Sequence, residues 1–257
     1  MAWAGRDSVR IMRPAHLAPA PRLIQPIPAR VPGHPRLAAA RRPASWVLGV
    51  AGLIAYNWWL LVPLRPELMR SPDEFFSNLE VTGQPYATVM QHCDVASGLL
   101  LVTAFLLVGS RSLPGARREW LGLVTFGLAG LVGGLFPQVC ADGISAACMT
   151  AEWHFRLPAS QYVHDGAGIV EFIAITLALL LAYRRTRPET RAARGWLPAR
   201  IYRLLAAGAV IAYPLLGLAY LTNHLGGIVE GVFFTGFTIM ILTQLAERLA
   251  ANSSDGT

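Results

Sequence analysis

Six long apolar segments restrict what this chain can fold into. A helix needs roughly 20 apolar residues to cross about 30 Å of hydrocarbon. The segments of that kind are 46–64, 86–109, 120–136, 162–183, 204–222 and 225–245. Charged residues make up only 14% of the 257, whereas a soluble domain carries about a quarter. We therefore expect an all-α fold, a six-helix transmembrane bundle whose main partner is the lipid bilayer.

The arginines predict the orientation of this bundle. All 22 basic residues are arginine, and 18 of them fall in residues 1–45, 111–118 and 184–203. Because arginine-rich flanks stay on the cytoplasmic side, we expect a multi-pass protein of the plasma (inner) membrane with cytoplasmic N- and C-termini. The high pI of about 9.9 is then explained by topology and anionic lipid, and no nucleic acid is expected as a partner.

Composition divides the chain into three regions. Residues 1–45 hold eight arginines, many prolines and a single acid, Asp7, a composition that cannot bury a core. We predict a disordered basic cytoplasmic tail at 1–45, a six-span membrane domain at 46–247, and a short cytoplasmic tail at 248–257.

Two of the three cysteines lie eight residues apart in one predicted extracytoplasmic loop. Cys140 and Cys148 are in an oxidising compartment and close enough to meet. The spacing predicts a disulfide that ties this loop, since a zinc site uses closer ligand pairs. Cys93 is expected to be a small buried apolar residue of the second helix.

Ionisable residues inside the predicted helices are the candidate functional groups, because an unpaired charge in a span costs several kcal/mol. Asp94, His164, Asp165 and Glu230 are predicted at similar depths near the extracytoplasmic ends of three helices. Glu171 follows His164 by seven residues and should lie roughly 10 Å deeper on the same face. The adjoining loop and turn add four more candidates, which are Ser77, Glu80, Gln84 and His224.

These groups are compatible with more than one role. They could line a pocket that opens outward, or form only structural hydrogen bonds between helices. Aspartate, histidine and serine at a membrane surface could also hold zinc and activate water. No pair of histidines has the i, i+4 spacing of metal ligands, so we assign no metal site, and the catalytic residues and cofactors stay unknown.

Two motifs resemble the actinobacterial branch of the membrane family called domain of unknown function 998. The first is FSNLEVTGQPYA at 76–87, followed by Asp94. The second is FPQVC at 136–140, followed by Cys148, Glu152, Ser160, His164 and Asp165. The resemblance runs from about Trp46 to the last helix and implies six spans without an established activity. Members commonly carry an aspartate where Val139 stands and a histidine where Gln161 stands, and these departures weaken a metal or proton site.

We therefore predict a membrane protein whose outward-facing polar pocket binds a lipid or envelope component, or docks a membrane protein partner. The alternative is a metal-dependent membrane hydrolase that acts on a lipid amide or ester. A third hypothesis is a proton-coupled small transporter that uses Glu171.

Overall fold

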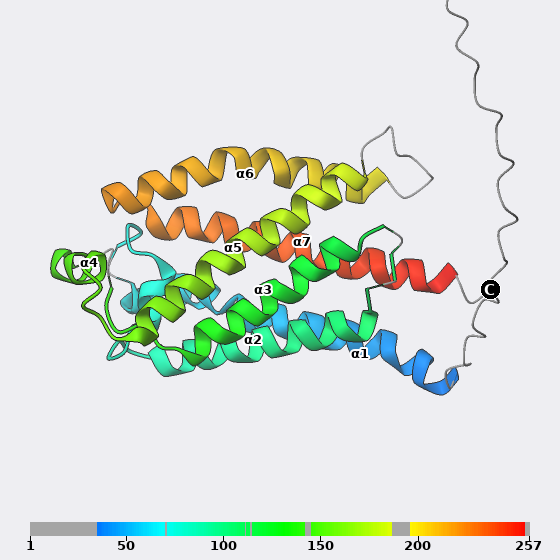
Figure 1. Cartoon of the computed structure of the whole chain (residues 1–257), viewed down its shortest axis with the longest axis horizontal. Coiled ribbons are helices and arrows are strands. Elements are labelled where there is room, and N and C mark those ends of the chain that lie inside the picture. Colours follow the sequence, from blue (N-terminus) through cyan, green and yellow to red (C-terminus); the bar gives the residue numbers. More distant parts are fainter. Residues whose placement is uncertain are drawn as a thin grey trace, which may run out of the picture. The chain divides into compact units, whose positions relative to one another are not determined.

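The computed structural model describes residues 35–69, 71–110, 112–113, 115–141, 145–186 and 196–254. Within these ranges the fold is all-α, as predicted, and no strand occurs (Figure 1). Its elements are α1 (Pro35–Tyr56), η1 (Trp58–Leu64), η2 (Pro66–Leu68), η3 (Phe76–Glu80), α2 (Ala87–Val108), α3 (Arg117–Leu135), α4 (Ala146–Trp153), α5 (Ala159–Arg185), α6 (Trp196–Thr222) and α7 (Gly226–Ser254), where η marks a 3₁₀ helix. All of them lie in one compact unit that begins at His34.

The described helices make this a multi-pass membrane protein, but they do not reproduce the count of six spans. Four helices, α2, α5, α6 and α7, are long and apolar enough to cross a membrane, and α1 with η1 adds a fifth if that bent pair is one span. Helix α3 does not meet the same standard, because its 19 residues begin with Arg117, Arg118 and Glu119. The short helix α4 and the 3₁₀ helices are elements that the apolar pattern did not predict.

The first predicted span is broken at Asn57. Helix α1 ends at Tyr56, and η1 continues at 45° to it. The Asn57 amide donates to Leu53 O (2.7 Å) and to Thr238 Oγ1 in α7 (2.9 Å). Its oxygen accepts from Trp59 Nε1 at 3.1 Å. At the bend, the Asn57 side chain therefore connects three parts of the structure: the end of α1, the start of η1, and α7.

Helix α1 also starts inside the segment predicted as a disordered tail. The sequence PRLAAARRPAS opens the helix with Pro35, and proline at the first helical position followed by alanine, leucine and arginine favours a helix. Residues 1–34 and 255–257 lie outside the described residues, and residues 248–254 continue α7.

Small residues bring α3 close to its two neighbours, α2 and α5, with which it packs extensively (Figure 1). A Cβ added at Gly98 of α2 would lie 2.5 Å from Gly127 O of α3, and one added at Gly122 would lie 2.8 Å from Ala174 O of α5. Glycine is required at these crossings, because any side chain would separate the backbones.

The segment between η1 and α2 is folded into the bundle, although the sequence predicted an extracytoplasmic loop. Phe75, Phe76, Leu79 and Val81 are buried, and η3 packs against α2 and α7. Burial of these apolar side chains draws η3 and its flanking residues inward.

The predicted disulfide between Cys140 and Cys148 is confirmed, with Cα atoms 5.7 Å apart. Helix α4 begins within the loop, where Ser145 Oγ accepts from the Cys148 amide at 3.3 Å. Cys93 is the free cysteine among the described residues and is partly buried. We refer to the end of the bundle that carries this bridge as the disulfide end.

Candidate functional site

Four carboxyl groups from four elements face one another near the disulfide end. They are Glu80 of η3, Asp94 of α2, Glu171 of α5 and Glu230 of α7, and we call them the acidic cluster. Glu80 interacts electrostatically with the other three, and Glu171 interacts with Asp94 and Glu230. Glu80 and Glu230 are only 4% and 6% exposed, and Asp94 and Glu171 are partly buried.

Hydrogen bonds from the η1 and η3 segments position two of these groups. Trp58 Nε1 donates to Asp94 Oδ1 at 2.9 Å. The Phe76 amide donates to Glu230 Oε2 at 2.5 Å, and the amide and hydroxyl of Ser77 also bond this carboxylate. The bend after α1 and the buried η3 segment are therefore what bring donors to the acids of α2 and α7.

Glu80 has the most unfavourable surroundings for a negative charge outside the spans. Burial raises the pKa of Glu80 well above its ordinary value, and the neighbouring Asp94, Glu230 and Glu171 carboxylates raise it further. The Glu80 and Asp94 carboxyl groups lie close enough to each other for a hydrogen bond. Two ionised carboxylates only accept hydrogen bonds, so this contact requires a proton.

Glu171 and Tyr56 both interact with Asp94 and Glu230 of the acidic cluster. Glu171 Oε1 lies against α3, where a Cβ added at Gly130 would be 3.5 Å away. Tyr56 interacts electrostatically with Glu171, Asp94 and Glu230, and its hydroxyl oxygen is buried without a hydrogen-bond partner. Glu171, predicted to lie roughly 10 Å below the other groups, thus belongs to the same cluster.

His164 and Asp165 take part differently from the prediction. His164 Nδ1 lies 3.0 Å from Gly133 O and 3.2 Å from Phe136 O, so it donates to the carbonyls that end α3. The His164 ring also interacts electrostatically with Asp94. Asp165 Oδ1 accepts from Gln161 Nε2 at 3.3 Å, and Gln161 Oε1 accepts from the Val139 amide at 2.9 Å. These two residues tie α5 to the segment after α3.

Gln84 and His224 lie apart from the cluster. Gln84 is exposed at the turn before α2. The His224 side chain is 74% exposed, and its Nδ1 lies 3.7 Å from Asp73 Oδ1. The structure thus brings together six of the predicted groups (Ser77, Glu80, Asp94, His164, Glu171 and Glu230) and leaves these two at the surface.

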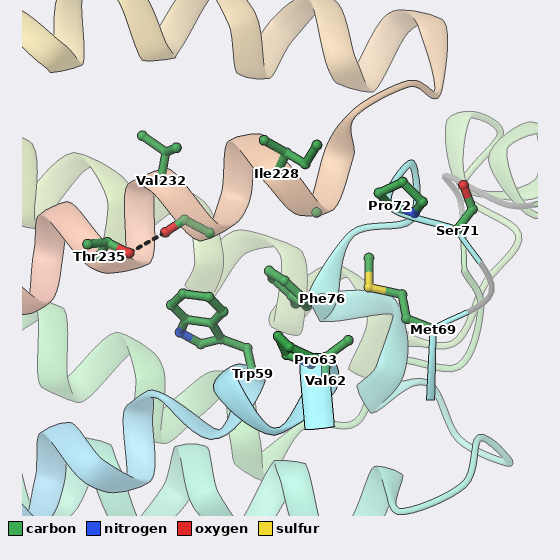
Figure 2. A pocket seen from close by; sticks show the side chains of 12 residues that line it. Trp59, Val62, Pro63, Met69, Ser71, Pro72, Phe76, Ile228, Val232 and Thr235 are labelled. Carbon is green, nitrogen blue, oxygen red and sulfur yellow. Dashed lines mark hydrogen bonds between the residues drawn. The ribbon is translucent and has the colours of Figure 1, made fainter. Parts of the chain in front are cut away.

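An apolar groove of about 600 Å³ opens beside the cluster, between η1 and α7 (Figure 2). Trp59, Val62 and Pro63 form one wall and Ile228, Gly231 and Val232 the other, while Phe76 lies between them. A second groove of about 750 Å³ shares Trp59 and Thr235 with the first and extends to Leu242. The lining of this groove is almost wholly apolar and includes none of the predicted polar candidates. Phe76 connects the groove to the cluster, because its amide donates to Glu230.

The sequence model of one protein family matches residues 49–247, which include η1, η3, both motifs and every member of the acidic cluster. The chain belongs to this family. It is described as "Protein of unknown function (DUF998)", a description that assigns no activity. No curated protein and no solved structure matches the chain.

This DUF998 protein has a second polar cluster at the opposite end, which the sequence did not reveal. Arg185 donates to Glu119 (2.8 and 3.1 Å) and to Glu247 Oε2 (2.9 Å). Tyr202 Oη donates to the same Glu247 oxygen at 2.5 Å. Arg248 is fully buried and donates to Gln244, Ser112 and the Ala116 carbonyl. Gln244 and Arg248 are four residues apart in α7, but the bonds of Arg185 to Glu119 and Glu247 join separate helices, so spacing along the chain carries no signal for them.

The hydrolase hypothesis requires a set of metal ligands in this DUF998 protein. Among the described residues, no group of three or more histidine, cysteine, aspartate or glutamate side chains is arranged to hold a metal ion. His164 and Asp94 of the hydrolase hypothesis thus have no third ligand there, and we derive no hydrolytic step.

Proposed function

We propose that this DUF998 protein binds a lipid in the groove between η1 and α7, with the acyl chain along the groove. The observation that supports this proposal is the groove itself. It has the volume of a small-molecule site, and its walls are almost wholly apolar. Its two walls belong to α7 and to η1 of the bent α1–η1 pair, which are candidate membrane spans, and Met69, Pro72 and Phe76 close one end. The bilayer is therefore the solvent around it, and a lipid chain is the apolar ligand at highest local concentration.

The length of the two adjoining grooves also favours a lipid acyl chain as the ligand. The first groove reaches Gly227, and the adjoining groove ends at Leu242. These residues are about 22 Å apart along α7, at 1.5 Å per residue. Trp59 stands where the two grooves meet and packs against Phe76 at 5.2 Å and Phe234 at 6.0 Å between ring centres. A long apolar chain can thus lie along α7 and contact Trp59 midway.

We also propose the orientation of the protein in the plasma (inner) membrane. Arginines at the end of α5 and near the starts of α6 and α3 lie at the end opposite the disulfide, and this distribution supports cytoplasmic termini. With α3 counted as a sixth span, the chain returns to the side on which it began. The groove then opens toward the outer leaflet.

Photo-crosslinking tests lipid binding directly. The protein is placed in vesicles of phosphatidylethanolamine and phosphatidylglycerol that contain a phosphatidylethanolamine with a diazirine in its acyl chain. We expect adducts to concentrate on the peptides around Trp59 and Ile228. Gly231→Leu should reduce them severalfold, because a Cβ there already lies 3.4 Å from Phe76 and 3.5 Å from Trp59 and a longer side chain fills the groove.

Gly217→Leu is the matched control, since a Cβ at that position of α6 meets nothing within 4 Å. It should leave the adduct pattern unchanged. Equal labelling along α6 and α7, or an unchanged pattern in Gly231→Leu, would mean that lipid only surrounds the protein and does not occupy the groove.

A further inference from the structure

The acidic cluster has more negative groups than the described structure neutralises. Each of Glu80, Asp94, Glu171 and Glu230 carries a carboxyl group, and none of them forms an ion pair with an arginine within the described residues. The chain contains no lysine. His164, which interacts electrostatically with Asp94 and donates Nδ1–H to the end of α3, is a single basic group beside four acids.

Four negative charges cannot remain together at such a site. Isolated buried charges are so unfavourable that the group gains or loses a proton instead. Two carboxylates that share a site cannot both ionise freely, as in acid pairs that hold one proton between them. The contact between Glu80 and Asp94 has this character, because a hydrogen bond between two carboxyl groups needs a proton on one of them.

A second observation also points to a bound proton. The Tyr56 ring is held between α3 and α7 by Phe126 (5.5 Å) and Phe234 (5.4 Å). Tyr56 is 9% exposed. It interacts electrostatically with Glu171, Asp94 and Glu230, and its hydroxyl has no hydrogen-bond partner. Glu80 Oε2 is also buried without one. A buried carboxylate oxygen without a donor is costly, and a proton on Glu80 removes its charge.

We propose that Glu80, Asp94, Glu171, Glu230 and Tyr56 form one proton-binding site inside the bundle. The step is the conversion of a carboxylate and a proton to a carboxylic acid, with no other bond made or broken. Metal ions are a poorer fit, because the described residues offer no metal-ligand group. The site lies behind the lipid groove, and its proton binding does not depend on lipid.

Every element packed around the site contributes to its titration or its polarity. The titratable groups that face it are Tyr56 of α1, Glu80 of η3, Cys93 and Asp94 of α2, His164 and Glu171 of α5, and Glu230 of α7. Helix α3 provides glycine at Gly130 and the carbonyl of Gly133. No fixed positive charge among the described groups competes with a proton here, so proton uptake is the way to neutralise the cluster.

Infrared difference spectroscopy of the full chain in lipid nanodiscs tests the proposal. At neutral pH we expect a carbonyl stretch from protonated carboxylic acid that shifts in D₂O and disappears in alkaline buffer. Glu80→Gln and Glu171→Gln should each lower the intensity of this band by the contribution of one carboxyl group. Glu67→Gln is the control, since Glu67 is exposed and paired with Arg65, and its ionised group contributes nothing to the band.

The wild-type spectrum alone can overturn the proposal, whether or not every variant folds. A wild-type protein without a protonated carboxyl band at neutral pH would show that the cluster holds no proton. A band that persists in full in Glu80→Gln, Asp94→Asn, Glu171→Gln and Glu230→Gln would place the protons elsewhere. Both outcomes leave crosslinking in the groove unaffected, so the two proposals fail separately.

Discussion

Removal of the Glu119 carboxylate should destabilise the bundle more than removal of any exposed acid. The carboxylate accepts from Arg185 Nε and Nη2 and from Gln244 Nε2 (2.9 Å), and its side chain is 3% exposed. Glu119→Ala removes two of the hydrogen bonds that Arg185 donates and leaves its bond to Glu247 in place. Breaking a buried pair on one side costs about 3–5 kcal/mol. Because Arg185 is 15% exposed and can draw on water, we expect about 3 kcal/mol, a loss of roughly 100-fold in the folding equilibrium.

The assay is reversible unfolding in mixed micelles of detergent and SDS, followed by circular dichroism. Glu67→Ala is the matched control, because Arg65 and Glu67 approach to 2.6 Å but are 56% and 58% exposed. Solvent screens such a pair, so no measurable change is expected there. Equal losses in both variants, or a loss below about 1 kcal/mol for Glu119→Ala, would refute the claim that burial makes this network stabilising.

Three further predictions follow from the packing, the disulfide and the topology. Gly98→Ala should lower the unfolding free energy by about 1–3 kcal/mol, whereas Gly217→Ala should be nearly neutral; equal effects would contradict the close α2–α3 crossing. Cys140 and Cys148 should resist a thiol reagent until reduced, and their loop closure should add about 2–3 kcal/mol; ready labelling without reductant would exclude the bridge. A C-terminal reporter should be cytoplasmic and one in the disulfide loop extracytoplasmic, and the opposite result would reverse the proposed orientation.

The apolar helices were predictable because a 20-residue apolar segment has few alternatives in lipid. The break at Asn57 was harder, since residues 46–64 are apolar almost throughout. Its signals are local: a polar Asn57 followed by two tryptophans, and Pro63, which removes a helical donor. Hydropathy averages over these residues, so it reports one span where the structure has α1 and η1.

The candidate site was predicted in part, through the rule that ionisable groups in spans are functional by default. That rule selected Asp94, Glu171 and Glu230, and the loop motif added Glu80. It could not reveal that η3 buries Phe76, Asn78, Leu79 and Glu80, although Phe75 and Phe76 are apolar signals within that loop. Tyr56 and Trp58 were missed because aromatic residues near a helix end are usual at membrane interfaces.

The two polar clusters show why an acid in a span has to be judged with its partners. Glu119 and Glu247 share the Arg185 guanidinium, so this end is neutralised by the protein itself and serves stability. Glu80 and Asp94 have no such cation within the described residues, and their charge must be balanced by a ligand. The proton is the ligand that fits a space already filled by Tyr56, Trp58 and Phe76. We accordingly assign proton binding to the acidic cluster and bundle stability to the second polar cluster around Arg185. In the sequence alone the two look similar, because each has an acid near the end of a helix.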